Sequence, residues 1–122
     1  EIPMLLEPFM SDWVDGKAVN RLTAEAVELS VAISSGLGST SAWSWLKLPV
    51  VENMERVMEA TTLPTLLLGG EGSSDQEATF GSWSNALALP GVKGLVVGRT
   101  LLYPHDNDVS KAVAQAANLV HK

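Results

Sequence analysis

The chain has 122 residues, of which 46% are hydrophobic and 18% charged, a composition that fits one modest globular domain and excludes two. Its net charge of -6 argues against nucleic acid or an anionic membrane as a partner, because either would require a basic face. Without cysteine and without an apolar run of about eighteen residues, we expect no disulfide, no thiolate zinc site and no transmembrane helix. These features fit a cytoplasmic protein.

The amino-terminal part predicts a strand, a loop and a helix. Residues 2–6 form an apolar strand that ends at Glu7 and Pro8, and the polar residues around Asp15 and Gly16 predict a loop. Residues 21–34 carry apolar side chains three and four positions apart, which is the spacing of one helical face. That predicted buried face consists of Leu22, Ala26, Leu29 and Ile33.

The middle of the chain predicts a second strand followed by a helix. Residues 42–51, with the sequence AWSWLKLPVV, form a mostly apolar run that stops near Pro49, as expected for a buried strand of a parallel sheet. Residues 50–60 repeat the helical spacing, with an acidic residue early and Arg56 late, an arrangement that the helix dipole favours. The predicted apolar face of this helix consists of Val50, Met54, Val57 and Met58.

Two more strands, each followed by a helix, are predicted after Pro64. Residues 64–68 form a buried strand, and residues 76–89 form a helix with Asp75, or alternatively Ser74, as its N-cap. Residues 92–97 form the fourth strand. The last helix is capped by Asp108 and carries Val109, Val113, Ala116 and Val120 on one side.

Strand and helix alternate four times, which is typical of a parallel α/β sheet built from βα units. We place these units at residues 1–38, 39–61, 62–91 and 92–122 of one domain. A doubly wound sheet and a (β/α)8 barrel both give this alternation, but an intact barrel needs about 250 residues. Because the chain starts with Glu1 directly before an apolar strand, we expect the second half, strands 5–8, of a barrel cut from a longer protein.

Lys47 is the one charged residue between Glu28 and Glu52. A lysine in a buried strand should face a cavity or a partner, since desolvation disfavours the charged ammonium. A partly neutral amine can attack a carbonyl and form a Schiff base. The alternative is a lysine at a strand end, with its stem packed and its head in water.

Glu7 ends the strand before that of Lys47, so the two heads could meet above the sheet. A carboxylate beside a nucleophilic amine can transfer protons during imine chemistry, although an ordinary salt bridge would explain the same pair.

Glycines follow the third and fourth strands, at Gly69-Gly70 and at Gly98, which precedes Arg99. Such turns let backbone N–H groups approach an anion, helix N-termini add positive charge, and Arg99 offers a bidentate donor. We therefore expect a phosphate site, with Ser73 and Ser74 as further donors or helix caps. A tight turn explains each glycine pair taken alone.

Aromatic and histidine residues carry weaker signals. Trp43 and Trp45 share the parity of Lys47 and should either line the same interior or be plain core residues, while Trp13 could be a rim or a packing residue. His105 and His121 have no metal-ligand spacing, so we expect surface residues and no metal site.

Three motifs together resemble a known group: WLKLP at 45–49, TTLPTLLLGGE at 61–71 and GVKGLVVGRTLLYP at 91–104. The chain is similar to the class I, Schiff-base aldolases that include deoxyribose-phosphate, tagatose-bisphosphate and archaeal-type fructose-bisphosphate aldolases. It looks closest to the actinobacterial (β/α)8 aldolase-like proteins associated with inositol catabolism. The likeness spans strand five to helix eight of such a barrel.

The resemblance implies a role for each matching residue. Lys47 matches the Schiff-base lysine and Glu7 the proton-transferring glutamate, while Gly69, Gly70, Gly98 and Arg99 match the phosphate-binding turns. It implies a homo-oligomeric lyase that acts on a phosphorylated sugar without a cofactor, because the protonated imine replaces a metal Lewis acid. A fragment that lacks the first half would be inactive by itself. The alternatives are a phosphate-binding isomerase or synthase without covalent chemistry, and an inactive structural module.

Overall fold

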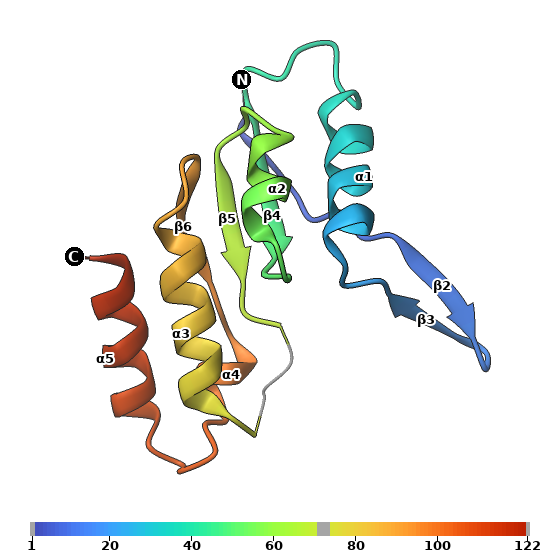
Figure 1. Ribbon diagram of the computed structural model, residues 1–122. Helices are drawn as coiled ribbons and strands as arrows, with labels where there is room; N and C mark the ends of the chain where they lie inside the picture. The colour runs from blue at the N-terminus through green and yellow to red at the C-terminus, as the bar shows by residue number, and fades with distance from the viewer. Residues whose placement is uncertain (1, 71–73, 122) are drawn as a thin grey trace.

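A computed structural model of the chain describes residues 2–70 and 74–121. Its centre is a parallel sheet of four strands in the order β1-β4-β5-β6 (Figure 1). The strands are β1 (Met4–Leu6), β4 (Ser44–Pro49), β5 (Thr65–Leu68) and β6 (Val92–Val96). The α/β fold with a parallel sheet is confirmed. Within the described residues, one edge of β1 and one edge of β6 have no partner strand.

Helices follow the strands, and most of them lie in a row on one side of the sheet (Figure 1). They are α1 (Ala24–Ser35), α2 (Met54–Glu59), α3 (Gln76–Leu87), the one-turn α4 (Arg99–Leu102) and α5 (Val109–Val120). Thr23, Asp75 and Asp108 cap α1, α3 and α5, because each side chain accepts a hydrogen bond from a backbone N–H of the first turn. The N-cap predictions for Asp75 and Asp108 are confirmed.

The hydrophobic core lies between the sheet and these helices. Leu46 and Leu48 of β4 and Leu67 of β5 are fully buried against Val31 of α1 and Val57 of α2. Side chains alternate between the two faces of a strand, so residues between these leucines point away from the helices. The opposite face of the sheet is therefore where Lys47 and its neighbours lie.

The loop that we predicted after the first strand is an antiparallel hairpin of β2 (Ser11–Val14) and β3 (Lys17–Asn20). Its two-residue turn has positive φ angles at Asp15 (49°) and Gly16 (76°), as a type I′ turn requires. The prediction was wrong because it weighed the polar residues and overlooked Asp-Gly, a strong hairpin signal. The hairpin extends away from the rest of the chain at the carboxyl end of the sheet (Figure 1).

The buried face predicted for α1 was largely wrong. Leu22, Leu29 and Ile33 are 58, 47 and 52% exposed, whereas Ala26 is buried as expected. The helix instead packs through small and branched side chains, which let it approach the sheet closely: Ala24, Ala26, Val27, Ser30, Val31 and Ser34. The larger residues form a stripe beside the buried face.

The four residues predicted to share one side of α5 differ in burial, and among them only Ala116 is buried. Val109, Val113 and Val120 are 39, 46 and 36% exposed, and the buried residues are Ala112 and Ala116. Figure 1 shows α5 beside α3 at the end of the row of helices, beyond β6. Among the residues that the structure describes, no strand lies beneath a helix in that position, so its valines stay partly in solvent. Three residues of the apolar face predicted for α2 are buried as expected, namely Met54, Val57 and Met58. Val50 was also predicted on this face, but it is half-buried and lies before the helix.

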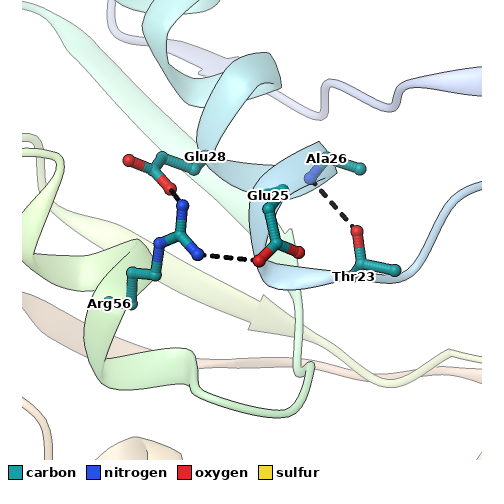
Figure 2. A network of polar contacts seen from close by, with 5 residues as sticks. All are labelled: Thr23, Glu25, Ala26, Glu28 and Arg56. Atoms are coloured by element: carbon teal, nitrogen blue, oxygen red, sulfur yellow. Dashed lines mark hydrogen bonds and ion pairs between the residues drawn. The ribbon is translucent and has the colours of Figure 1, made fainter.

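Arg56 joins α1 to α2 through two carboxylates (Figure 2). Its Nη1 donates to Oε1 of Glu25 at 2.7 Å, and its Nη2 lies 2.8 Å from Oε2 of Glu28. The second contact is an ion pair without hydrogen-bond geometry, since that Glu28 oxygen has no hydrogen-bond partner. The guanidinium therefore links α1 to α2 at the surface, directly after the strand that carries Lys47.

In the part of the chain that the structure describes, no helix has the length and apolarity needed to cross a membrane.

Candidate active site

Lys47 lies in β4 between two fully buried leucines, Leu46 and Leu48. Because both leucines face the helices, the lysine points to the opposite, concave face. Its side chain is 20% exposed, so most of the stem is packed while the ammonium remains accessible. This is the side on which a barrel interior would lie.

Glu7 provides a partner for this ammonium. Nζ of Lys47 donates to Oε2 of Glu7 at 2.8 Å, and the glutamate side chain is 44% exposed. The strand register explains the pair: Leu6 lies opposite Leu46 in the parallel ladder, so the next residue of each strand comes together. An amine and a carboxylate at this distance can exchange a proton directly.

The two glycine turns lie side by side at the ends of β5 and β6. Leu68 is opposite Val96 in the ladder, which places Gly69 opposite Val97. A Cβ added to Gly69 would lie 2.6 Å from Cγ1 of Val97, so no side chain fits there. Gly70 has a φ of +68°, a conformation that favours glycine. Both turns thus present backbone rather than side chains at this edge.

One cavity of about 1060 Å³ brings the predicted residues together. Lys47, Glu7, Gly69, Gly70, Gly98 and Arg99 all line it. The amine and the carboxylate belong to the β1–β4 side, while the glycine turns and Arg99 belong to the β5–β6 side. A molecule that bridges both sides would meet a nucleophile, a proton carrier and a set of anion donors.

The contribution of helix N-termini to anion binding stays a prediction. The first turn of α3 is capped by Asp75, which accepts a hydrogen bond of 2.9 Å from the N–H of Ala78 and brings its own negative charge. The helix after Gly98, α4, has a single turn. Ser74 does not line the cavity, and Ser73 lies outside the described residues. Donors that line the cavity include backbone groups of the turns, Arg99 and the side chains of Asn20, Thr79 and Ser82.

The tryptophans do not surround Lys47 as predicted. Trp43 and Trp45 are 47 and 37% exposed and do not line the cavity, because they precede the lysine and lie toward the amino end of the sheet. Trp13 is 77% exposed on the hairpin and also stands outside the cavity lining. His105 and His121 are exposed, as expected for surface residues.

Sequence reasoning missed the contribution of the hairpin to the site. Ala18, Val19 and Asn20 of β3 and the preceding Phe9 line the same cavity. The Oγ of Ser11 donates to Oδ1 of Asn20 at 2.6 Å and thereby holds the base of the hairpin. The Asp-Gly turn was the available signal, but it did not indicate which side of β3 would face the cavity.

Within residues 2–70 and 74–121, no group of three or more His, Asp or Glu side chains is placed to hold a metal ion.

A family model described as Cgl0159-like matches residues 1–117. The crystal structure of Cgl0159 from Corynebacterium glutamicum is 66% identical in sequence and superimposes with a TM-score of 0.93. That match covers 98% of this chain and 40% of the Corynebacterium chain. A search of the curated proteins found no match.

Solved structures of class I aldolases share the fold at lower identity. A Schiff-base-forming fructose-1,6-bisphosphate aldolase is 24% identical, with a TM-score of 0.73 and coverage of 97% of this chain and 45% of that chain. An archaeal fructose-1,6-bisphosphate aldolase is 22% identical, with a TM-score of 0.74 and coverage of 98% and 45%. The chain therefore spans less than half the length of these proteins and has the fold of half of their barrel. Because the family model matches residues 1–117, the chain belongs to the Cgl0159-like family.

Proposed function

We propose that a protein containing this chain is a class I aldolase that cleaves or forms a C–C bond of a sugar phosphate. The main observation behind the proposal is that Nζ of Lys47 lies 2.8 Å from Oε2 of Glu7, in a cavity that is also lined by the two glycine turns and Arg99. The aldolases of similar fold support the proposal, since one of them is described as Schiff-base-forming and another holds its catalytic lysine covalently bound to a carbinolamine intermediate of the substrate.

In this mechanism the neutral amine of Lys47 attacks the ketone carbon of the substrate and forms a carbinolamine. Loss of water gives a protonated imine, which accepts the electron pair of the breaking C–C bond and becomes an enamine as the aldehyde leaves. Glu7 takes a proton from the hydroxyl that becomes this aldehyde and can return a proton to the enamine carbon. Water then hydrolyses the imine and restores the amine.

The turns on the β5–β6 side would hold the phosphate of the substrate. Backbone N–H groups at Gly69, Gly70 and Gly98 and the guanidinium of Arg99 are donors that suit a phosphate group. Because the chain spans under half the length of its relatives, the activity is proposed for the longer protein and not for these 122 residues alone. The same proposal makes this longer protein a cytoplasmic homo-oligomer that takes part in inositol catabolism.

The test is borohydride reduction of the longer protein in the presence of dihydroxyacetone phosphate. We expect a stable mass increase on the peptide that contains Lys47. A Lys47→Arg variant keeps the positive charge but cannot form an imine, so it should lose both the adduct and the activity. An adduct on another peptide, or activity retained by Lys47→Arg, would instead favour non-covalent phosphate chemistry or a different nucleophile.

A further inference from the structure

Thr100 connects the two glycine turns. It lies in α4 directly after Arg99 and is buried, with 5% of its surface exposed. Its Oγ1 donates to the carbonyl oxygen of Gly69, 31 residues earlier in the chain, at 3.4 Å. This is a long hydrogen bond, so it adds little to stability, but it relates one turn to the other in space.

Packing strengthens the relationship between the turns. Gly69 touches Val97 so closely that an added Cβ would lie 2.6 Å from Cγ1 of the valine. The hydroxyl of Thr100 and the side chain of Val97 thus both contact Gly69 from the same connecting segment. The position of the first turn is set by residues that flank the second.

Arg99 is held within the same segment. The carbonyl of Gly98 accepts hydrogen bonds of 3.0 Å from the N–H groups of both Leu101 and Leu102, and the N–H of Tyr103 donates to the carbonyl of Arg99 at 2.9 Å. These bonds form the single turn of α4. Any shift of Thr100 relative to Gly69 would therefore move the backbone of Gly98 and Arg99 with it.

We propose that Thr100 is a positioning residue that holds the two turns and Arg99 in the register needed to bind one phosphate group. The inference rests on the proposed function for its ligand, a phosphorylated ketone. Thr100 does not line the cavity, so its hydroxyl would act on the phosphate through the two turns and not by touching the substrate. Its removal should impair recognition of the phosphate and spare the reaction of the amine.

The experiment uses Thr100→Val and Thr100→Ser in the longer protein. Borohydride trapping at Lys47 is measured against the concentration of dihydroxyacetone phosphate and of unphosphorylated dihydroxyacetone. Thr100→Val should raise the half-saturating concentration of the phosphorylated ketone about 2-fold, as expected for the loss of one long, weak hydrogen bond. It should leave the curve for the unphosphorylated ketone and the maximal trapping unchanged, and Thr100→Ser should restore the wild-type curve.

Thr65→Val is the matched control. Thr65 is a fully buried threonine of β5 whose Oγ1 donates to the carbonyl of Leu63 at 3.1 Å, and it does not line the cavity. This variant also loses a buried hydroxyl, but it should shift neither curve. If Thr100→Val changes both ketones equally, or behaves like Thr65→Val, Thr100 is merely structural and the inference is overturned.

Failure of the proposed function gives a different result. If the wild-type protein traps neither ketone at Lys47, the aldolase proposal fails, and binding of inorganic phosphate then tests Thr100 by itself. The NMR shifts of the Gly69 and Gly70 amides should change as inorganic phosphate is added, and the apparent Kd from these shifts should be about 2-fold weaker for Thr100→Val than for the wild type. Equal binding by both proteins, or none by the wild type, would overturn the inference.

Discussion

Lys47 and Glu7 are 40 residues apart in the chain, yet Nζ of the lysine lies 2.8 Å from Oε2 of the glutamate. The parallel pairing of β1 with β4 brings them together at one level of the sheet. A salt bridge and a catalytic pair have the same geometry at rest, so the two readings differ in what happens when the carboxylate is removed.

Glu7→Gln should separate these readings. The amide keeps the size of the side chain but cannot exchange protons, so turnover of the longer protein should fall by about 100-fold or more. The borohydride adduct should still form on the peptide that contains Lys47. Steady-state rates together with mass spectrometry measure both effects.

Glu59→Gln is a suitable control, because Glu59 ends α2 and does not line the cavity. It should leave turnover unchanged. Wild-type turnover in Glu7→Gln would mean that the carboxylate is only an ion-pair partner of Lys47.

Gly69→Ala should destabilise the chain and disturb the phosphate turn. Its Cβ would lie 2.6 Å from Cγ1 of Val97, so β5 and β6 must shift apart at this end. Overpacking of this kind costs about 1–3 kcal/mol in the free energy of unfolding. Urea denaturation followed by circular dichroism measures the loss.

Gly81→Ala provides the matched glycine substitution. Gly81 lies inside α3 with nothing within 4 Å of an added Cβ, so alanine should raise the free energy of unfolding by about 0.5–1 kcal/mol. Equal effects of the two substitutions would contradict the close approach of Gly69 to Val97.

The Glu25–Arg56 ion pair should make stability depend on pH. A hydrogen bond from its own backbone at the start of α1, followed by the charge of Arg56, lowers the pKa of Glu25 below its ordinary value of 4.5. A carboxyl with a lowered pKa stabilises the folded state above its unfolded pKa, and this contribution is lost as pH falls through the folded value. Glu25→Gln should therefore lower the Tm at pH 7 and have no effect in strong acid.

A double-mutant cycle with Arg56→Gln assigns the effect to the pair. The coupling between the two substitutions should be small, because both side chains are largely exposed, and it should shrink at high salt. Coupling that stays constant from pH 7 down to strong acid would show that the charge of Glu25 is not involved.

The 122-residue chain alone should self-associate. The N–H of Met4 donates to the carbonyl oxygen of Trp43 at 2.8 Å, on the side of β1 that pairs with β4. Because successive N–H groups of a strand point to opposite sides, the N–H of Leu5 points toward the open edge of β1. An unpaired edge beside exposed apolar side chains is a template for another strand. Light scattering should show species larger than a monomer.

Leu5→Pro removes the N–H group at the open edge and keeps the hydrogen bond from Met4 to Trp43. The variant should therefore contain a larger share of monomer than the wild-type chain. Leu5→Ala keeps the N–H group and should self-associate more than Leu5→Pro does. A wild-type chain that stays monomeric at high concentration would contradict this role of the open edge.

Much of the candidate site could be predicted from the residues because a parallel α/β sheet brings the carboxyl ends of its strands to one edge. That rule placed Glu7, Lys47 and both glycine turns near one another, and all of them line one cavity. The contribution of the hairpin and of Thr100 could not be predicted in this way. Their roles depend on contacts between segments far apart in the chain, such as that of Thr100 with Gly69.

The sequence by itself determined the order of the four parallel strands and of the longer helices that follow them, the caps at Asp75 and Asp108, and the residues available for chemistry, because these follow from local spacing and local hydrogen bonds. The tertiary structure decided which helical faces are buried. On α1 both the stripe with Leu29 and the face with Val31 have helical spacing, and close approach to the sheet selected the smaller residues. Burial depends on what lies opposite a side chain, and spacing along one helix carries no information about that neighbour.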